Sequence, residues 1–142
     1  MTPRPTAFAI LVLAAGGGLL ATASPTRAHH SFAAEFDAAQ PITVKGTVAR
    51  IDLVNPHAWL YVEVKKTDGS VERWNVEMGS PNSLIRRGVS KQSVPIGAEV
   101  TVEGYRAKDG SPTMNGRTVT LADGRSLFTG SAGSGAPNDP PR

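Results

Sequence analysis

The chain contains three histidines, which are its strongest candidates for binding a transition metal. His29 and His30 are adjacent, and His57 follows Asn55 and Pro56. Because the chain has no cysteine, a metal ion would have to be held by histidine, methionine, a carboxylate or a free amine. The predicted chemistry is coordination of a metal ion by histidine nitrogens, which requires a fold that brings these histidines together.

The residues before His29 indicate how the first two histidines become available as ligands. Residues 1–28 resemble a secretory signal, with an early arginine, an apolar run and a segment of small residues at its end. Two cleavage positions fit the small-residue pattern, after Ala23 and after Ala28, and the second is favoured. Cleavage after Ala28 would give an exported, periplasmic or secreted protein whose first residue is His29.

An N-terminal His29 would offer an α-amine and an imidazole to the same ion. We expect His57 to supply the opposing imidazole and His30 to lie beside them, with Glu35 or Asp37 as an outer ligand. Nitrogen ligation of this kind favours copper(II) over zinc or magnesium. In a simpler interpretation the adjacent histidines are only solvated, and the ring of His57 bonds a backbone carbonyl in its turn.

Trp59 and Tyr61 are candidates for binding a different kind of ligand. They alternate with apolar residues along their expected strand, so both should point away from the core. Two aromatic side chains on an open sheet face can stack on a base or a sugar, and Arg73 is expected on the same face across the hairpin. Alternatively, Phe32 and Phe36 of the N-terminal segment cover these aromatics.

Two other kinds of chemistry have weaker support. Trp74, Met78 and Met114 could form a soft copper(I) site, but their loose spacing favours a place in the buried core for Trp74 and Met78. The chain has no G-x-S-x-G, no H-E-x-x-H and no phosphate-binding loop, so an enzyme ranks below a binding protein.

The elements that must position these residues are mostly strands. An alternating pattern predicts strands separated by Asp-Gly turns and by a turn at Pro95 and Gly97. Ser80, Pro81 and Gly88 are typical of the two ends of a short helix. A phase slip near Val48 and Ala49 predicts a bulge in the first strand. The expected strands span residues 42–54, 58–66, 71–78, 98–106 and 117–121, with a short piece at 126–128 and the helix at 80–88.

This order, β-β-β-α-β-β, predicts an all-β fold with one short helix, an OB-like five-stranded barrel. A plain β-sandwich and an open meander are the alternatives. The domain organisation follows as a signal peptide (1–28), a histidine-containing segment (29–40), the OB-like domain (41–128) and a disordered Gly/Ser/Pro tail (129–142) that buries no core.

The charge balance argues against a nucleic-acid partner. The full chain carries fifteen basic and twelve acidic residues, a formal net charge of +3. Arg4 and Arg27 would leave with the signal, which reduces the net charge of the remaining chain to +1. A nearly neutral exported protein is not expected to bind nucleic acid, and the apolar run is too short to hold it stably in a membrane.

Several motifs resemble a family of small exported bacterial proteins of unknown function. They are A-H-H-S-F-x-x-E-F-D, N-P-H-A-W, W-x-V-E-M-x-S-P-N-x-L-x-R-x-G and G-x-x-V-T-V-x-G-Y-x-A-K-D-G, which together run from residue 28 to residue 110. The resemblance runs from about residue 28 to residue 127, which is most of the chain after the signal, and implies export and a small β fold. It implies no activity, and the His-Met-Met-Trp arrangement of small copper-efflux chaperones is not reproduced.

The sequence therefore predicts a non-enzymatic binding protein of the periplasm that holds copper, a metal ion or another small ligand. The metal ligands would be His29, His30 and His57. The alternative is a module that binds a small molecule, glycan or protein with the face of Trp59, Tyr61 and Arg73.

Overall fold

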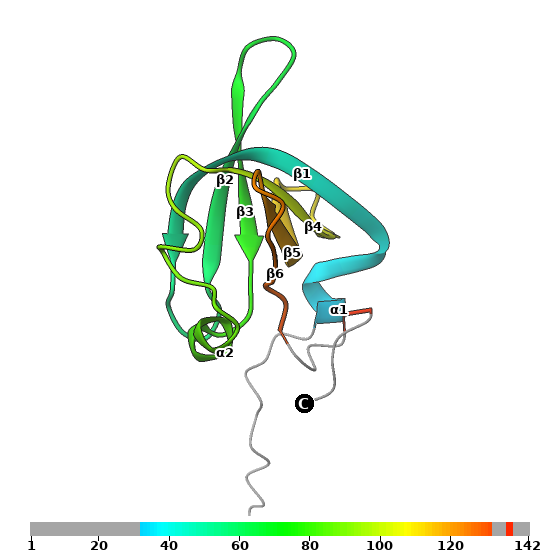
Figure 1. Cartoon of the computed structure of the whole chain (residues 1–142). Helices are drawn as coiled ribbons and strands as arrows, with labels where there is room; N and C mark the ends of the chain where they lie inside the picture. Colours follow the sequence, from blue (N-terminus) through cyan, green and yellow to red (C-terminus); the bar gives the residue numbers. More distant parts are fainter. Residues whose placement is uncertain (1–31, 132–135, 138–142) are drawn as a thin grey trace, which may run out of the picture.

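The structure is a computed structural model that describes residues 32–131 and 136–137. It is built from a twisted, mostly antiparallel sheet with two short helices (Figure 1). In chain order the elements are α1 (Phe32–Glu35), β1 (Phe36–Asp52), β2 (Trp59–Lys65), β3 (Val71–Glu77), α2 (Pro81–Arg86), β4 (Glu99–Ala107), β5 (Thr113–Leu121) and β6 (Ser126–Phe128).

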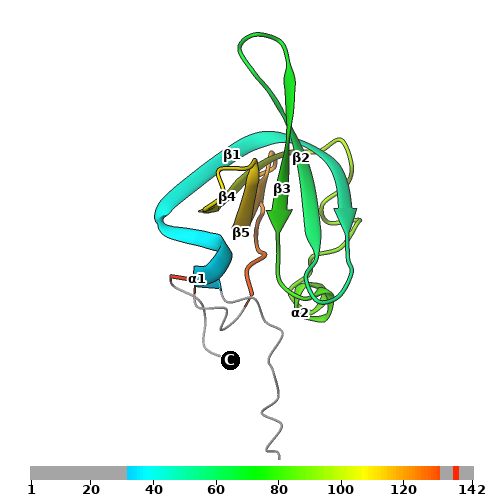
Figure 2. The ribbon, with the colours of Figure 1, turned by 180° about the vertical axis from the view of Figure 1, so that it is seen from behind.

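Five of the strands close into a ring, called the strand ring below. The sheet order is β3-β2-β1-β4-β5-β6, and a parallel pairing of β3 with β5 joins the two sides. The helix α2 connects β3 to β4, so the predicted all-β class and the β-β-β-α-β-β order are confirmed. Figure 2 is a view from behind, in which the long β1 curves over the strand ring below the projecting β2–β3 hairpin.

β1 can serve both sides of the ring because it bends. Its first half pairs with β4 and its second half with β2, and the register with β2 shifts between Val48 and Arg50, which confirms the predicted bulge. At Gly46 a Cβ atom would collide with the carbonyl of Glu63, so only glycine permits this close approach.

The main core fills the interior of the strand ring. It consists of alternate residues of the strands together with apolar side chains from α2 and the segment that follows it. Trp74 is 7% exposed and Met78 1%, which confirms their assignment to the core, and Met114 is fully buried beside them. α2 begins at Pro81, and Gly88 adopts a positive φ of 84° after its end, as expected for these residue types.

A second, smaller core lies outside the ring, where α1 meets β4. Phe32, Phe36, Ala107 and Ala136 are buried there against Tyr105. Two sequence expectations are therefore wrong. The N-terminal segment does not end at Pro41, because β1 already begins at Phe36; and the residues after Phe128 do contribute to the core, because Ala136 is 6% exposed.

The residue that follows β6 also binds the sheet. Thr129 is fully buried, and its amide donates to the carbonyl of Arg117. Its own carbonyl accepts a hydrogen bond from the amide of Gly79. The domain therefore extends past Phe128. The sequence did not predict this, because the composition of the tail gives no sign of these backbone hydrogen bonds.

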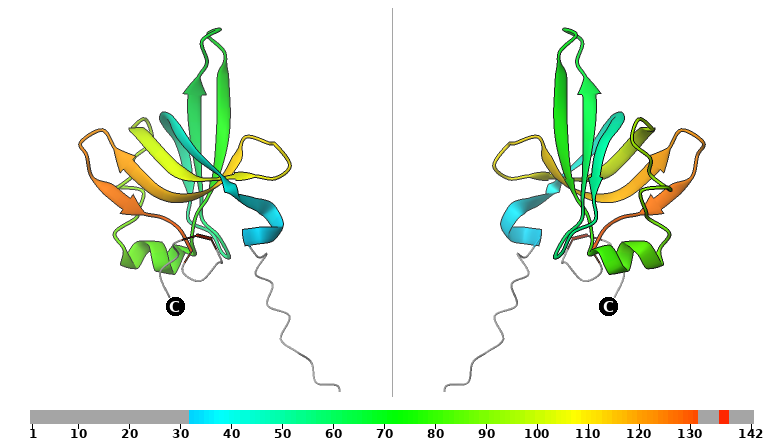
Figure 3. Two further views of the ribbon diagram at one scale, coloured as in Figure 1. Left: turned by 90° about the vertical axis from the view of Figure 1, so that its right-hand side faces the viewer. Right: turned by 90° about the vertical axis from the view of Figure 1, so that its left-hand side faces the viewer.

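The two ends of the strand ring differ in shape (Figures 1 and 3). From one end, the hairpin end, the β2–β3 hairpin projects with its turn at residues 66–70. At the opposite end, the loop end, lie the β1–β2 loop, α1 and α2. His57 belongs to the β1–β2 loop, so the loop end is where the candidate metal chemistry must be sought.

Candidate functional site

His57 is half-buried at the loop end, and one side of its ring is anchored. Its Nδ1 lies 3.2 Å from the carbonyl oxygen of Met78 and 3.5 Å from Oε1 of Glu77. A neutral ring that donates its Nδ1 proton to this carbonyl leaves Nε2 as an acceptor. No described residue makes a hydrogen bond to Nε2, so the ring has one nitrogen held and one available.

Glu77 is the partner of His57 that the sequence did not identify. It ends β3 and pairs directly with Trp59 of β2 and with Asn115 of β5. Because directly paired residues project to the same side of a sheet, these side chains share the outer face. The pairing continues from Asn115 to Tyr105 of β4, so one row crosses four strands.

Asn115 occupies an unusual position in this row. It is 3% exposed, and its Oδ1 has no hydrogen-bond partner among residues 32–131 and 136–137. Leaving a buried polar group unpaired costs about 1–3 kcal/mol, so such a residue is a candidate for binding something from outside the described fold. An isolated asparagine in a strand carries no sequence signal of this, since its burial depends on the pairing of β5 with β3 and β4.

His29 and His30 lie outside the described residues, which begin at Phe32. Phe32 itself packs edge-on against Tyr105, with 5.3 Å between ring centroids. Within residues 32–131 and 136–137 no group of three histidine or carboxylate side chains is close enough to hold a metal ion. The described part of the chain therefore contributes His57 and Glu77, but not a complete metal site.

The candidate outer ligands have different environments. Asp37 accepts hydrogen bonds from the amide of Ala39 and from Nε2 of Gln40, and these bonds hold the pKa of its carboxyl below the usual range. The carbonyl of Glu35 accepts a hydrogen bond from the amide of Lys108 at 2.9 Å. Asp37 is thus already engaged in a local turn, whereas Glu35 lines a cavity beside Trp59.

Trp59, Tyr61 and Arg73 do not form one open aromatic face. The guanidinium of Arg50 covers the ring of Tyr61 at 4.8 Å from its centroid. Arg73 forms an ion pair of 2.8 Å with Glu63 toward the hairpin end. Trp59 lines a cavity together with Phe36 at the start of β1, whereas Phe32 packs on Tyr105.

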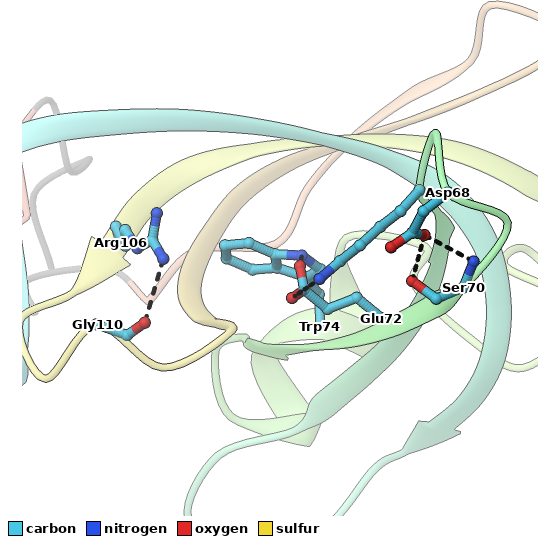
Figure 4. Close-up of polar contacts among 7 residues, drawn as sticks. Asp68, Ser70, Glu72, Trp74, Arg106 and Gly110 are labelled. Atoms are coloured by element: carbon cyan, nitrogen blue, oxygen red, sulfur yellow. Dashed lines mark hydrogen bonds and ion pairs between the residues drawn. The ribbon is translucent and has the colours of Figure 1, made fainter.

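Trp74 is held by contacts that suit a structural residue (Figure 4). Its Nε1 donates to Glu72 at 2.9 Å, and Glu72 forms an ion pair with Lys66. Arg106 lies over the indole at 5.6 Å from the ring centroid and donates to the carbonyl of Gly110. Because the indole nitrogen is bonded and the ring is packed, Trp74 is a structural residue of the core.

The fold and the half-buried histidine define a small, ring-forming β protein with a polar cluster at its loop end. The chain belongs to a family of unknown function (DUF6152), whose model matches residues 15–116. This match confirms the resemblance to an uncharacterised family, and the family has no enzyme assignment. No curated protein and no solved structure matches the chain significantly.

Neither helix in the described part of the chain is long and apolar enough to cross a membrane.

Proposed function

We propose that this chain is an exported, non-enzymatic protein that binds copper(II), with His57 as the ligand contributed by the folded domain. Nε2 of His57 would coordinate the ion, and His29 and His30 would supply the remaining nitrogens. The observation that carries the proposal is the anchoring of Nδ1 against the Met78 carbonyl and the Glu77 carboxylate. Metal-binding histidines usually have such a partner on the other ring nitrogen, which orients the ring.

The length of the chain supports participation of the N-terminal histidines. His30 is two residues from Phe32, so its backbone lies within about 7 Å of that residue. Phe32 contacts Tyr105, which is two strands from Glu77 in the paired row, roughly 10 Å at ordinary strand spacing. The proposal requires the side chain of His30 to extend across this distance toward His57.

Export is part of the same proposal. Residues 1–28 have the pattern of a cleavable signal, and cleavage after Ala28 would create the amine that a copper site of this type uses. The absence of cysteine suits a protein that offers nitrogen rather than thiolate ligands. Bound copper(II) would be available for storage or transfer, while the protein's own residues only hold it.

Competition titration with a copper(II) chelator tests the proposal. The chain beginning at His29 is compared with a His57→Ala variant and with a chain that carries one additional residue before His29. We expect one copper per chain, and weaker binding by at least about 100-fold in the His57→Ala variant. The extended chain should also bind more weakly, because its terminal amine no longer belongs to His29.

Two further variants separate the ligand from its support. Glu77→Gln should lower copper affinity by about 10- to 100-fold, because outer partners of a ligating histidine contribute that much. Glu63→Gln changes a carboxylate at the hairpin end and should leave affinity unchanged. Copper binding that is indifferent to both His57→Ala and the added residue would overturn the proposal.

A further inference from the structure

A separate cavity of about 350 Å³ lies between α1, the start of β2 and the β4–β5 turn. Hydrogen bonds join α1 to the β4–β5 turn beside this cavity. The amide of Lys108 donates to the carbonyl of Glu35, and Nζ of Lys108 donates to the carbonyl of Ala33. His57 is not among its lining residues, whereas Glu35, which the sequence offers as an outer metal ligand, is. Its lining residues are Ala34, Glu35, Phe36, Trp59, Ala107, Lys108, Asp109, Ser111 and Thr113.

Aromatic side chains form part of the wall. Trp59 is half-buried, and in the described part of the chain its indole is not covered by a cation, unlike Trp74 and Tyr61. Phe36 is buried beneath the same cavity. An indole face attracts cations more strongly than any other aromatic side chain does, so this wall favours a positively charged ligand.

The charge of the lining agrees with this preference. The lining includes two acidic residues, Glu35 and Asp109, and one basic residue, Lys108, whose ammonium already donates to the carbonyl of Ala33. Bonds from the hydroxyl and amide of Ser111 hold the pKa of Asp109 below its usual range, so this carboxylate is charged at neutral pH. The lining therefore has an excess of negative charge.

The hydrogen bonding of the lining argues against a sugar. The Oδ1 of Asp109 accepts the amide of Ser111 at 2.9 Å, and the Ser111 hydroxyl is also bonded to this carboxylate. The Asp109 carboxylate keeps its negative charge, but it and Ser111 have fewer free donors and acceptors for the hydroxyls of a sugar. Recognition by charge and by the indole face is left as the main source of affinity.

We propose that this cavity binds a small organic cation, with a methylated ammonium group placed against Trp59. The ligand class is that of choline, free in solution, since the cavity volume suits one small molecule. Trp59 supplies the face for the cation, and Asp109 supplies a nearby negative charge. This proposal does not rest on the copper proposal, although Trp59 pairs in the sheet with Glu77, the partner of His57.

Calorimetric titration with choline tests the proposal, with 3,3-dimethylbutanol as the neutral molecule of the same shape. Both are added to the full chain in the presence of a copper chelator, so that metal binding plays no part. We expect choline to bind at least about fivefold more tightly than the neutral alcohol, with a change in tryptophan fluorescence. Trp59→Leu should remove this preference, and circular dichroism shows whether that variant is folded.

A matched pair of turn variants keeps the test decisive. The turns at 67–70 and 108–111 both contain Asp-Gly-Ser, and Asp68 accepts the amide of Ser70 as Asp109 accepts that of Ser111. Asp109→Asn should weaken choline binding by about threefold or more, whereas Asp68→Asn should not change it. The proposal is overturned if the alcohol binds as tightly as choline, if choline does not bind, or if the two variants behave alike.

Discussion

The two ends of the strand ring satisfy their polar side chains in different ways. At the hairpin end, charged groups pair with one another: Lys66 with Glu72, and Arg73 with Glu63. At the loop end, the described residues bond only one ring nitrogen of His57, and they leave the oxygen of the buried Asn115 side chain without a hydrogen bond. The difference teaches that these charged side chains of the hairpin end are paired within the described fold, whereas the polar groups of the loop end are paired only in part.

Solvation explains why the difference matters. The exposed ion pairs of the hairpin end lie in water, where each contributes little to stability. A buried amide oxygen has no water to replace a missing partner, so the side chain of Asn115 lowers the free energy of unfolding. Positions that lower stability in this way are typical of binding sites.

The largest stability effect that we expect concerns the packing of α1 at the loop end. Phe32→Ala removes the side chain that joins α1 to Tyr105, and should destabilise the fold by about 3 kcal/mol. Urea denaturation measures this loss. The control is Val71→Ala at the hairpin end, where the side chain is 54% exposed and the change should be below about 0.5 kcal/mol. Equal losses in the two variants would contradict the view that α1 is an integral part of the fold.

The next effect has the opposite sign. Asn115→Leu replaces a buried amide with an apolar side chain of similar size, and should stabilise the protein by about 1–2 kcal/mol, because the unpaired oxygen is removed. The same denaturation experiment measures it. If Asn115→Leu destabilises the fold, the amide has a partner that matters, and the contrast between the two ends becomes weaker.

The smallest effect is expected at the hairpin end. Arg73→Met removes the exposed pair with Glu63, and should change the free energy of unfolding by less than about 1 kcal/mol. Copper and choline binding should both be unaffected. A large loss of either kind of binding in this variant would show that the hairpin end also contributes to function.

The pH dependence of stability tests what Asp68 and Asp109 contribute to the folded state apart from any ligand. In both Asp68 and Asp109 the folded pKa is lowered, mainly by the hydroxyl of the serine two residues later. Each therefore contributes stability that is present above the unfolded pKa and is lost as the pH falls through the folded pKa. The stability difference between wild type and Asp68→Asn should accordingly narrow in acid, and thermal denaturation between neutral pH and about pH 3 measures it.

Much of the fold follows from the sequence because it depends on local pattern. The alternation of apolar residues predicts the strands, and Pro81 and Gly88 mark the limits of α2. The phase slip near Val48 predicts the bulge. β5 begins at Thr113 rather than at the expected Arg117, because Met114 and Gly116 face a neighbouring strand that no local pattern reveals.

The candidate site follows from the sequence only in part. His57 stands out because histidine is rare in the chain and Asn-Pro precedes it. Its pairing with Glu77, twenty residues away, arises when β2 and β3 align, and Asn115 reaches the same row only when β5 pairs with β3. Non-local contacts of this kind have no signature in a single sequence.

The central claim is that Nε2 of His57 binds copper(II) while Nδ1 remains on the Met78 carbonyl. Pulsed electron paramagnetic resonance of the copper-loaded chain that begins at His29 tests it most directly, because the remote nitrogen of a coordinated imidazole modulates the echo. The account predicts that His57→Ala removes part of this modulation and the tight binding with it. An unchanged echo in His57→Ala, with copper still bound, would contradict the account.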